Sequence, residues 1–283
     1  MDSLRDREVP QEPSQEGGPL EQDGTAGAAS RSAIVTGGVS GLGRAVAQRL
    51  LDMGYGVTVT HRTSHVKAEA FVDLARSRGQ PLLALAADAG DEQAVAASLR
   101  AHRERYGVPW ALVHAAGPFL TSRTPFAEAD LPAMRKVLDG NLWSAMLCAK
   151  VALGAMHEAG RGGRIVFFGF DEAAAFPAWF GRAAYAAAKS GVISLARTLS
   201  EEEAPHGITV NVICPGDIRR PLKEGGIADA RQSAEGAAPI GRPGSGEDVA
   251  RLIAFLLDED SDFLTGNIIA VDGGLDVIHR GRG

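Results

Sequence analysis

The sequence has few cysteines, no excess of basic charge and no long apolar run. Its 283 residues include two cysteines, Cys148 and Cys214, and no Cys-x-x-Cys pair, so neither a disulfide framework nor a cysteine-rich zinc site is predicted. The seven histidines form no His-Glu-x-x-His motif, and we predict no metal centre. Because no apolar run approaches the ~18 residues needed to span a bilayer, we expect no membrane segment.

The charge balance argues against a nucleic-acid-binding protein. Lys and Arg total 29 against 35 Asp and Glu, which gives a net charge of −6. Residues 1–30 are acidic, rich in Pro, Gly, Gln and Ser, and poor in large apolar side chains. We therefore expect a disordered acidic tail over 1–30 and a single domain over 31–283. The tail resembles neither a secretory signal nor a transit peptide, and with reduced cysteines this predicts a cytoplasmic protein.

From residue 32 onward, short apolar runs alternate with segments of helical spacing. The expected strands cover 32–36, 56–60, 82–86, 110–114, 164–168, 208–213 and 267–271. The expected helices cover 42–53, 66–78, 91–105, 130–157, 182–203 and 247–257. The strand candidates are continuously apolar, as strands buried on both faces are. This pattern predicts an α/β fold, a single Rossmann-type doubly wound parallel sheet of about seven strands flanked by helices.

A glycine-rich loop follows the first expected strand. The stretch from Thr36 to Gly43 reads Thr-Gly-Gly-Val-Ser-Gly-Leu-Gly, and a helix is expected to begin within it. Glycines allow a tight turn and a close approach of the backbone to a ligand. The free N–H groups at the start of a helix favour an anion, so the loop predicts a pyrophosphate site.

The end of the second expected strand indicates which dinucleotide binds. An acidic residue is usual at this point in NAD sites, where it binds the ribose 2′-hydroxyl. Here no acid occurs between Asp52 and Glu69, and Arg62 is present instead. Because a guanidinium binds a 2′-phosphate that a carboxylate would repel, we predict that NADP(H) is preferred, with NAD(H) as the alternative. A solvated Arg62 is the other interpretation.

Further motifs follow in order along the chain: Asp88, the stretch from His114 to Gly117 (His-Ala-Ala-Gly), Asn141, Tyr185-x3-Lys189, Pro215-Gly216, and Asp272-Gly273-Gly274. Together with the glycine loop, their order and spacing resemble the short-chain dehydrogenase/reductase family over roughly 32–275. Within it, the chain most resembles the 3-oxoacyl-carrier-protein reductases. The resemblance implies cofactor contacts from Thr36, Gly37, Ser40, Gly41, Leu42, Gly43, Arg62, Asp88, Ala89, Ala115, Ala116, Gly117, Tyr185, Lys189, Pro215, Gly216 and Ile218.

Tyr185 and Lys189 are the expected catalytic pair. They lie four residues apart, so they share one helical face. A nearby ammonium and a positively charged nicotinamide ring would both favour the phenolate and lower the pKa of the phenol. This suits Tyr185 to general acid catalysis of carbonyl or imine reduction. By resemblance, Lys189 would also bind the nicotinamide ribose. Asn141 would hold a water that links Lys189 to solvent.

The family's active-site serine has no counterpart in this sequence. No Ser or Thr occurs from Ile165 to Ala184. Counting back from Tyr185 puts Glu172 at the serine position, with Asp171 beside it, whereas counting forward from the strand puts Phe170 there. Either acid could replace the serine, as an Asp does in the family's pteridine reductases. Alternatively, both acids are solvated and Tyr185 acts with a water or a backbone donor.

Two more departures concern His114 and a basic segment after Pro215-Gly216. His114 stands where the family has Asn, and we expect it to be a hydrogen-bonding core residue rather than a proton relay. Arg219, Arg220 and Lys223 either bind an anionic substrate, such as a carboxylate or a carrier-linked acyl group, or form a solvated hinge. The Gly- and Ala-rich stretch 224–238 should be a mobile lid.

These observations predict an NADPH-dependent reductase that acts on a 3-oxoacyl group or another ketone. A pteridine-type or imine reductase that uses a carboxylate in place of the serine is one alternative. A dinucleotide-binding sensor or scaffold with little catalysis is another. We expect a small-molecule substrate, with neither a nucleic acid nor a membrane as partner. The resemblance implies a homodimer or homotetramer paired through the helices expected at 130–157 and 182–203, with residues 275–278 at a second interface.

Overall fold

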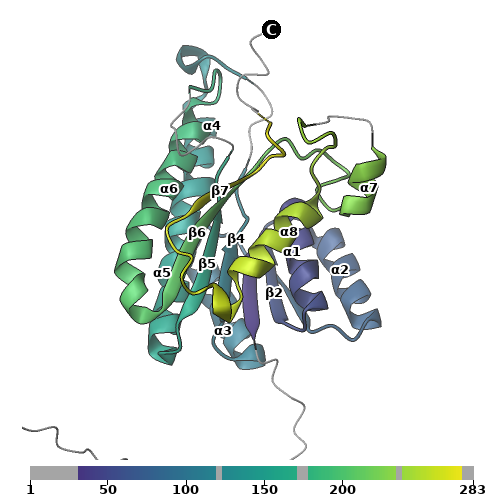
Figure 1. Cartoon of the computed structure of the whole chain (residues 1–283). Coiled ribbons are helices and arrows are strands. Elements are labelled where there is room, and N and C mark those ends of the chain that lie inside the picture. Colours follow the sequence, from purple (N-terminus) through teal and green to yellow (C-terminus); the bar gives the residue numbers. More distant parts are fainter. Residues whose placement is uncertain (1–30, 119–122, 171–177, 234–237, 276–283) are drawn as a thin grey trace, which may run out of the picture.

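Seven parallel strands form one sheet in the order β3-β2-β1-β4-β5-β6-β7 (Figure 1). The computed structural model describes residues 31–118, 123–170, 178–233 and 238–275. The expected tail over 1–30 lies outside the described residues. The strands are β1 Ser32–Thr36, β2 Gly56–His61, β3 Leu82–Ala86, β4 Ala111–His114, β5 Gly163–Phe168, β6 Ile208–Pro215 and β7 Ile268–Val271. The predicted doubly wound parallel sheet is confirmed.

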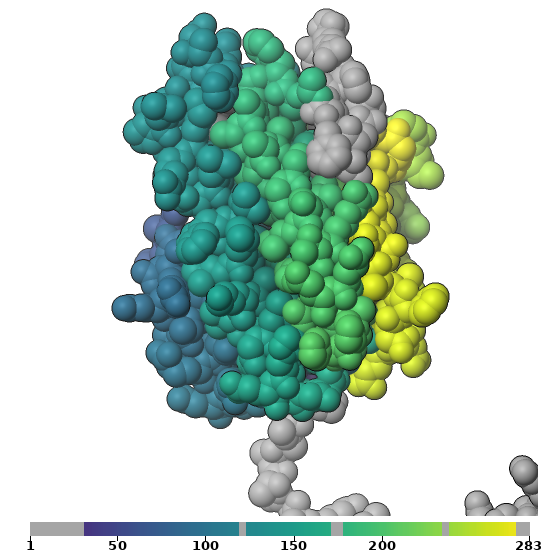
Figure 2. Space-filling view, turned by 90° about the vertical axis from the view of Figure 1, so that its left-hand side faces the viewer, coloured from purple at the N-terminus to yellow at the C-terminus, as the bar shows by residue number. Residues whose placement is uncertain are grey.

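Helices cover both faces of the sheet because its strands are apolar on both sides. The helices are α1 Gly41–Asp52, α2 His65–Ser77, α3 Glu92–Tyr106, α4 Leu131–Leu138, α5 Ser144–Ala159, α6 Ala183–Glu203, α7 Ile227–Gln232 and α8 Gly246–Leu256. One core lies between the sheet and α1, α2 and α8. The other lies between the sheet and α3, α5 and α6, which stand side by side in Figure 2. Each layer removes apolar surface from water.

The helix expected over 130–157 contains a change of helical type. A π-helical segment, Asp139–Trp143, separates α4 from α5. Its centre is held by Asn141, whose Nδ2 donates to the carbonyl oxygens of Pro118 at 3.0 Å and Val137 at 2.9 Å. Such bulges often re-aim a functional side chain. The long helix predicted over 130–157 is therefore present as one helical stretch from 131 to 159, with a π-helical segment that the sequence analysis did not predict.

The predicted lid is not wholly irregular, since its stretch 224–238 includes the short helix α7. The glycine before that helix, Gly226, donates its backbone N–H to Asp229 at 3.0 Å. Residues 234–237 of this stretch lie outside the described part of the chain. No helix in the described ranges is both long and apolar enough to cross a membrane.

Candidate active site

An elongated cleft runs along the carboxyl ends of the strands. Its larger part has a volume of about 350 Å³ and lies where β1, β4, β5 and β6 end. A second part of about 240 Å³ lies beyond the end of β2. Both parts are lined by Ser40, Ala116 and Gly117, so they are two ends of one cleft. Of the residues predicted to contact the cofactor, all except Thr36 line this cleft.

The glycine loop is built for close backbone contacts. A Cβ on Gly43 would lie 2.6 Å from the carbonyl oxygen of Gly37, and a Cβ on Gly37 would lie 3.1 Å from the backbone of Ala116. Gly41 adopts φ +62°, a left-handed conformation that favours glycine. With the N-terminus of α1 opening onto the cleft, this backbone fits the pyrophosphate of a dinucleotide.

Thr36 has a structural role instead of lining the cleft. Its Oγ1 lies 2.9 Å from Nδ1 of His114 and accepts a hydrogen bond from the backbone N–H of Ala116 at 3.2 Å. His114 Nε2 lies 3.1 Å from the Ser144 hydroxyl, and burial lowers the pKa of the imidazole to about 3. His114 is thus a neutral core residue tying β1 and β4 to α5, as predicted. Thr36 therefore affects the cleft indirectly, by fixing the ends of β1 and β4.

One acidic side chain at the glycine loop was missed by the sequence analysis. Glu224 Oε1 accepts a hydrogen bond from the backbone N–H of Gly41 at 2.7 Å. Its other oxygen lies 3.6 Å from Nε of Arg44 on α1. A carboxylate therefore occupies the position where the helix N-terminus attracts an anion. No local sequence signal could have found this contact, because Glu224 and Gly41 lie 183 positions apart.

Arg62 lies at the far end of the cleft, at the position predicted to discriminate between cofactors. Its guanidinium is 3.7 Å from Asp88, and both side chains are about half exposed at 54% and 51%. Exposed pairs of this kind are weak, so Arg62 can turn toward a ligand at little cost. The neighbouring His61 is buried, and burial together with the charge of His65 lowers its pKa. Arg62, the residue that follows β2, therefore places a positive charge at this end of the cleft.

Tyr185 and Lys189 share the floor of the larger part, as predicted from their spacing. The Lys189 ammonium lies 5.8 Å from the Tyr185 ring centroid and donates a hydrogen bond to the carbonyl oxygen of Phe168 at 2.8 Å. Burial lowers the pKa of Lys189 to about 8. The pair is therefore assembled beside the end of β5.

The pKa of Tyr185 differs from the sequence expectation. Burial and, to a smaller extent, the nearby Cys214 raise it to about 12, and the positive charge of Arg182 opposes part of this rise. Lys189 is not among the charges that act on the Tyr185 pKa in this structure, where the cost of burying a phenolate exceeds the effect of nearby positive charge. The lowering expected from Lys189 together with a bound, positively charged nicotinamide ring stays a prediction. The phenol is therefore protonated at neutral pH and able to donate.

Asn141 lines the same cleft from the π-helical segment. With both hydrogen bonds of its Nδ2 directed at backbone carbonyls, its buried Oδ1 accepts no hydrogen bond from the described residues. This oxygen faces Gly117, where a Cβ would collide with it. The glycine at 117 thus leaves room for the amide, and the amide presents an acceptor beside the cleft.

Phe170, which counting forward from the strand puts at the serine position, belongs to an aromatic wall of the cleft. Phe170 is buried, with its ring centroid 5.2 Å from that of Trp179 and 6.2 Å from that of Tyr185. Trp179 meets Tyr185 edge to face at 5.9 Å. Asp171 and Glu172, the two predicted replacements, lie outside the described residues. Phe170 and Trp179 line the cleft, and their apolar character gave no catalytic signal in the sequence.

The basic segment divides between surface and cleft. Arg219 pairs with Asp217 at 2.6 Å. Arg220 and Lys223 line the cleft and also an adjoining open hollow of about 640 Å³, to which Lys67 contributes. Arg220 and Lys223 therefore place two positive charges where the cleft adjoins this open hollow, which we call the cleft entrance.

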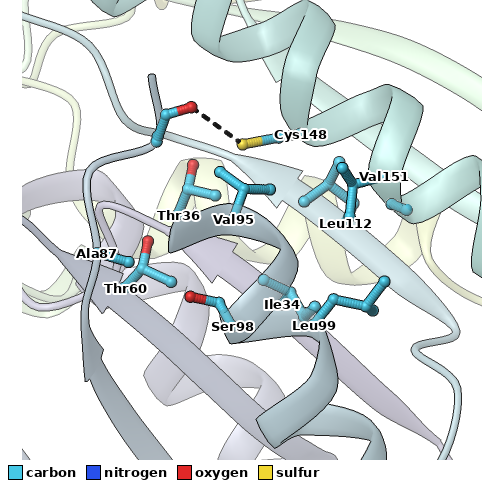
Figure 3. A pocket seen from close by; sticks show the side chains of 12 residues that line it. Ile34, Thr36, Thr60, Ala87, Val95, Ser98, Leu99, Leu112, Cys148 and Val151 are labelled. Atoms are coloured by element: carbon cyan, nitrogen blue, oxygen red, sulfur yellow. Dashed lines mark hydrogen bonds between the residues drawn. The ribbon is translucent and has the colours of Figure 1, made fainter. Parts of the chain in front are cut away.

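A small apolar cavity beneath the cleft is a packing defect rather than a ligand site. It has a volume of about 20 Å³ and lies among Ile34, Val95, Leu99 and Leu112 (Figure 3). Cys148 borders it, and its thiol donates to the carbonyl oxygen of Ala89 at 3.7 Å. Burial raises the pKa of this thiol to about 12, so it is unreactive at neutral pH.

Comparison with known proteins supports this interpretation of the cleft. A family model described as Enoyl-(Acyl carrier protein) reductase matches residues 37–276. YtkK of Bacillus subtilis, a protein named as an oxidoreductase, is 37% identical over 253 residues, which cover 89% of this chain and 99% of the relative. The 3-oxoacyl-acyl-carrier-protein reductase FabG of Staphylococcus aureus is 31% identical over 246 residues, covering 87% of this chain and 98% of FabG.

A solved structure extends the similarity to three dimensions. A single-residue variant of actinorhodin polyketide ketoreductase, solved with NADPH, has a TM-score of 0.77 and 29% identity, with coverage of 89% of this chain and 99% of that one. All three of these proteins are named as oxidoreductases or reductases. The chain is thus related to enzymes, which argues against a catalytically silent sensor or scaffold.

Proposed function

The chain belongs to the short-chain dehydrogenase/reductase family of NAD(P)(H)-binding oxidoreductases, and from this membership we propose that it reduces a carbonyl group with NADPH, using Tyr185 as the proton donor. The observation that carries the proposal is a partly buried phenol, protonated at neutral pH, one helical turn from a buried ammonium on the floor of the cleft at the strand ends. When bound, the cofactor supplies the hydride. The protein's own residues would supply the proton and orient the substrate and the cofactor.

Tyr185 would donate its hydroxyl proton to the carbonyl oxygen as that oxygen gains negative charge. General acid catalysis of this kind typically contributes ~10²–10⁴-fold to the rate. Arg182 lowers the pKa of the phenol and would stabilise the phenolate that remains. The burial that raises the same pKa keeps the phenol protonated near neutral pH, which is the state that donates a proton in reduction.

Lys189 and Asn141 would then return a proton to Tyr185. The pKa of Lys189, about 8, lets the side chain exchange protons close to neutral pH. The unsatisfied Oδ1 of Asn141 can accept a hydrogen bond from a water that lies between the ammonium and solvent. In this proposal both are positioning and relay residues, whereas Tyr185 contacts the substrate.

The cofactor preference rests on Arg62. The end of β2 offers a guanidinium, and the segment from Thr63 to Ser64 that follows it also lines the cleft. Asp88 is the acid nearest to this cation, and its Oδ1 already accepts the backbone N–H of Gly90 at 3.0 Å. A 2′-phosphate would gain a charge-assisted hydrogen bond here that a 2′-hydroxyl would not.

The substrate is proposed to be a ketone that carries an anionic group, such as a 3-oxoacyl group on a phosphopantetheine carrier. Arg220 and Lys223 stand at the cleft entrance, where a phosphate or carboxylate of the substrate would lie within reach. The aliphatic or aromatic remainder would pack against Phe168 and Phe170. Charged groups at an entrance steer association more than they add to affinity.

The test is an NADPH-consumption screen over simple ketones, β-ketoacyl thioesters, quinones and pterins, with Tyr185→Phe as the control. We expect turnover of at least one carbonyl class, and a loss of about 10²-fold or more in kcat for the variant with NADPH binding retained. Turnover that persists unchanged in Tyr185→Phe would refute the assignment of the proton donor.

A second candidate substrate is a flat conjugated ring, such as a pterin or another cyclic imine. The aromatic wall of Phe170, Trp179 and Tyr185 favours it, because stacked or edge-to-face rings gain about 0.5–1.5 kcal/mol beyond burial. Phe170→Leu should raise KM for ring substrates more than for aliphatic ketones. Phe255→Leu, at an exposed ring on α8, is the matched control. Equal effects on both substrate classes would eliminate this candidate.

We also propose that copies of the chain pair through the layer of α5 and α6. Trp143, the last residue of the π-helical segment, and Met146 on α5 are 51% and 43% exposed, and exposed large apolar side chains near one another favour an interaction surface. The second interface expected at 275–278 falls largely outside the described residues. Light scattering on wild type and on Met146→Glu would test the pairing, and a monomeric wild type would refute it.

A further inference from the structure

A cluster of two histidines and a glutamate lies where α5 and α6 end. His157 is in the last turn of α5, Glu203 closes α6, and His206 follows in the 3-10 turn Ala204–His206. One ligating atom from each side chain lies within 4.8 Å of the other two. Nε2 of His157 is 2.5 Å from Oε2 of Glu203, and the two imidazole centroids are 4.2 Å apart.

This cluster is distant from the cleft. His157 lies 13 residues beyond Ser144, the first residue of α5, which at ~1.5 Å per residue is about 20 Å along the helix axis. Glu203 is separated from Lys189 by a similar length of α6. The cluster therefore has no part in the proposed reaction, and its chemistry requires a separate explanation.

We propose that His157, Glu203 and His206 form a binding site for a divalent transition-metal ion, with Zn²⁺ as the representative case. Two imidazole nitrogens and one carboxylate oxygen are a recurrent Zn²⁺ ligand set, completed by water in the fourth position. Imidazole selects Zn²⁺, Ni²⁺ and Cu²⁺ over Mg²⁺ and Ca²⁺, which prefer oxygen ligands.

The burial of the three side chains supports this assignment. The Glu203 side chain is 9% exposed, so its carboxylate is held in one place, and a buried carboxylate needs a positive partner. The His157 side chain is 39% exposed and His206 is exposed, so an ion can enter from solvent and both rings can turn toward it. In Zn²⁺ sites the metal–nitrogen distance is about 2.0–2.1 Å, so neighbouring ligand atoms lie about 3.3 Å apart. Small rotations of the two exposed rings would reach this geometry.

The ion would join the C-terminal ends of two neighbouring helices. Both helices present backbone carbonyls at these ends, where positive charge is favoured. The expected result of binding is a higher melting temperature without a change in NADPH oxidation. This result would separate a structural ion from one that acts in the cleft.

The test uses the full chain without a histidine tag, stripped of metal with EDTA and dialysed. Calorimetric titration with Zn²⁺ should give one ion per chain, and Co²⁺ should give visible absorption bands of a low-coordinate site. His157→Ala and His206→Ala should each weaken Zn²⁺ binding about tenfold or more. Mg²⁺ should not compete.

His65→Ala is the matched control, because His65 is an exposed histidine in edge-to-face contact with another, His61, with centroids 5.0 Å apart. This variant should bind Zn²⁺ as wild type does. Circular dichroism and NADPH titration confirm that each variant is folded. The proposal is overturned if wild type binds no Zn²⁺ at micromolar concentrations, or if His206→Ala binds it as tightly as wild type.

Discussion

The Glu224 carboxylate accepts a hydrogen bond from the backbone N–H of Gly41, at 2.7 Å, at the start of α1. Gly41 belongs to the loop that fits a pyrophosphate, and the same carboxylate lies 3.6 Å from Arg44 on that helix. The side chain thus makes the contacts that a cofactor phosphate would make. It links the segment after β6, which precedes α7, to the cofactor end of the cleft.

Glu224→Gln should therefore tighten NADPH binding. The neutral amide keeps the size of the side chain but removes a negative charge that competes with phosphate for the N-terminus of α1. We expect the Kd for NADPH to fall about three- to tenfold, since about 1 kcal/mol of competition is removed. Fluorescence titration would measure this. Glu201→Gln, on an exposed part of α6, is the control, and weaker binding by Glu224→Gln would show that the carboxylate supports the bound state instead.

Arg62 should control the choice between the two dinucleotides. Arg62→Ala removes the cation at the end of β2, so the Kd for NADPH should rise about tenfold or more, while that for NADH changes little. The ratio of the two constants is the quantity to measure. Arg78→Ala, at the exposed end of α2, is the matched control. A parallel change for both cofactors would mean that Arg62 does not contact the 2′-phosphate.

Much of this architecture could be predicted from local sequence. The strands at 32–36 and 82–86 were predicted to the residue, because their apolar runs end sharply at turns. The glycine loop and the four-residue spacing of Tyr185 and Lys189 likewise made the site recognisable from local sequence. The hydrogen bond from Asn141 in the π-helical segment to Pro118 could not be predicted, because Pro118 lies 23 residues away.

The electrostatics of the site were less predictable than its geometry. Proximity of Lys189 suggested a lowered pKa for Tyr185, yet burial outweighs this and raises the value. Burial depends on the whole fold rather than on residues four positions apart. The contact between Glu224 and Gly41 joins residues separated by 183 positions, for which local spacing gives no signal.

Two buried histidines should make the fold sensitive to acid. Burial lowers the pKa of His102 to about 4 and that of His114 to about 3. Between these values and about 6.5, the unfolded chain binds protons that the folded chain does not, so the free energy of unfolding falls as pH falls. Each histidine contributes a slope of up to about 1.4 kcal/mol per pH unit.

The double variant His102→Asn, His114→Asn should flatten this slope. Urea unfolding at intervals between pH 7 and pH 4.5 would measure it. Loss of absolute stability from altered packing does not affect the comparison, because only the pH dependence is compared. Above pH 7, where neither imidazole titrates, the variant and wild type should have parallel profiles. An unchanged acid slope in the variant would contradict the neutral state assigned to both rings.

Arg182 should set the pH dependence of the reverse reaction, the oxidation of an alcohol, in which Tyr185 must accept a proton. The guanidinium lowers the pKa of Tyr185, whereas burial raises it. Arg182→Gln removes the lowering effect, so the phenol pKa moves further up and a smaller fraction is phenolate at any pH below it. The oxidation rate at a fixed pH should then fall about three- to tenfold, since each unit of pKa corresponds to about tenfold in the fraction ionised. Reduction at pH 7 should change less, because the phenol is already protonated there. Arg182→Lys keeps the charge and should retain most of the oxidation rate, and equal losses in the two variants would mean that Arg182 acts through packing rather than through its charge.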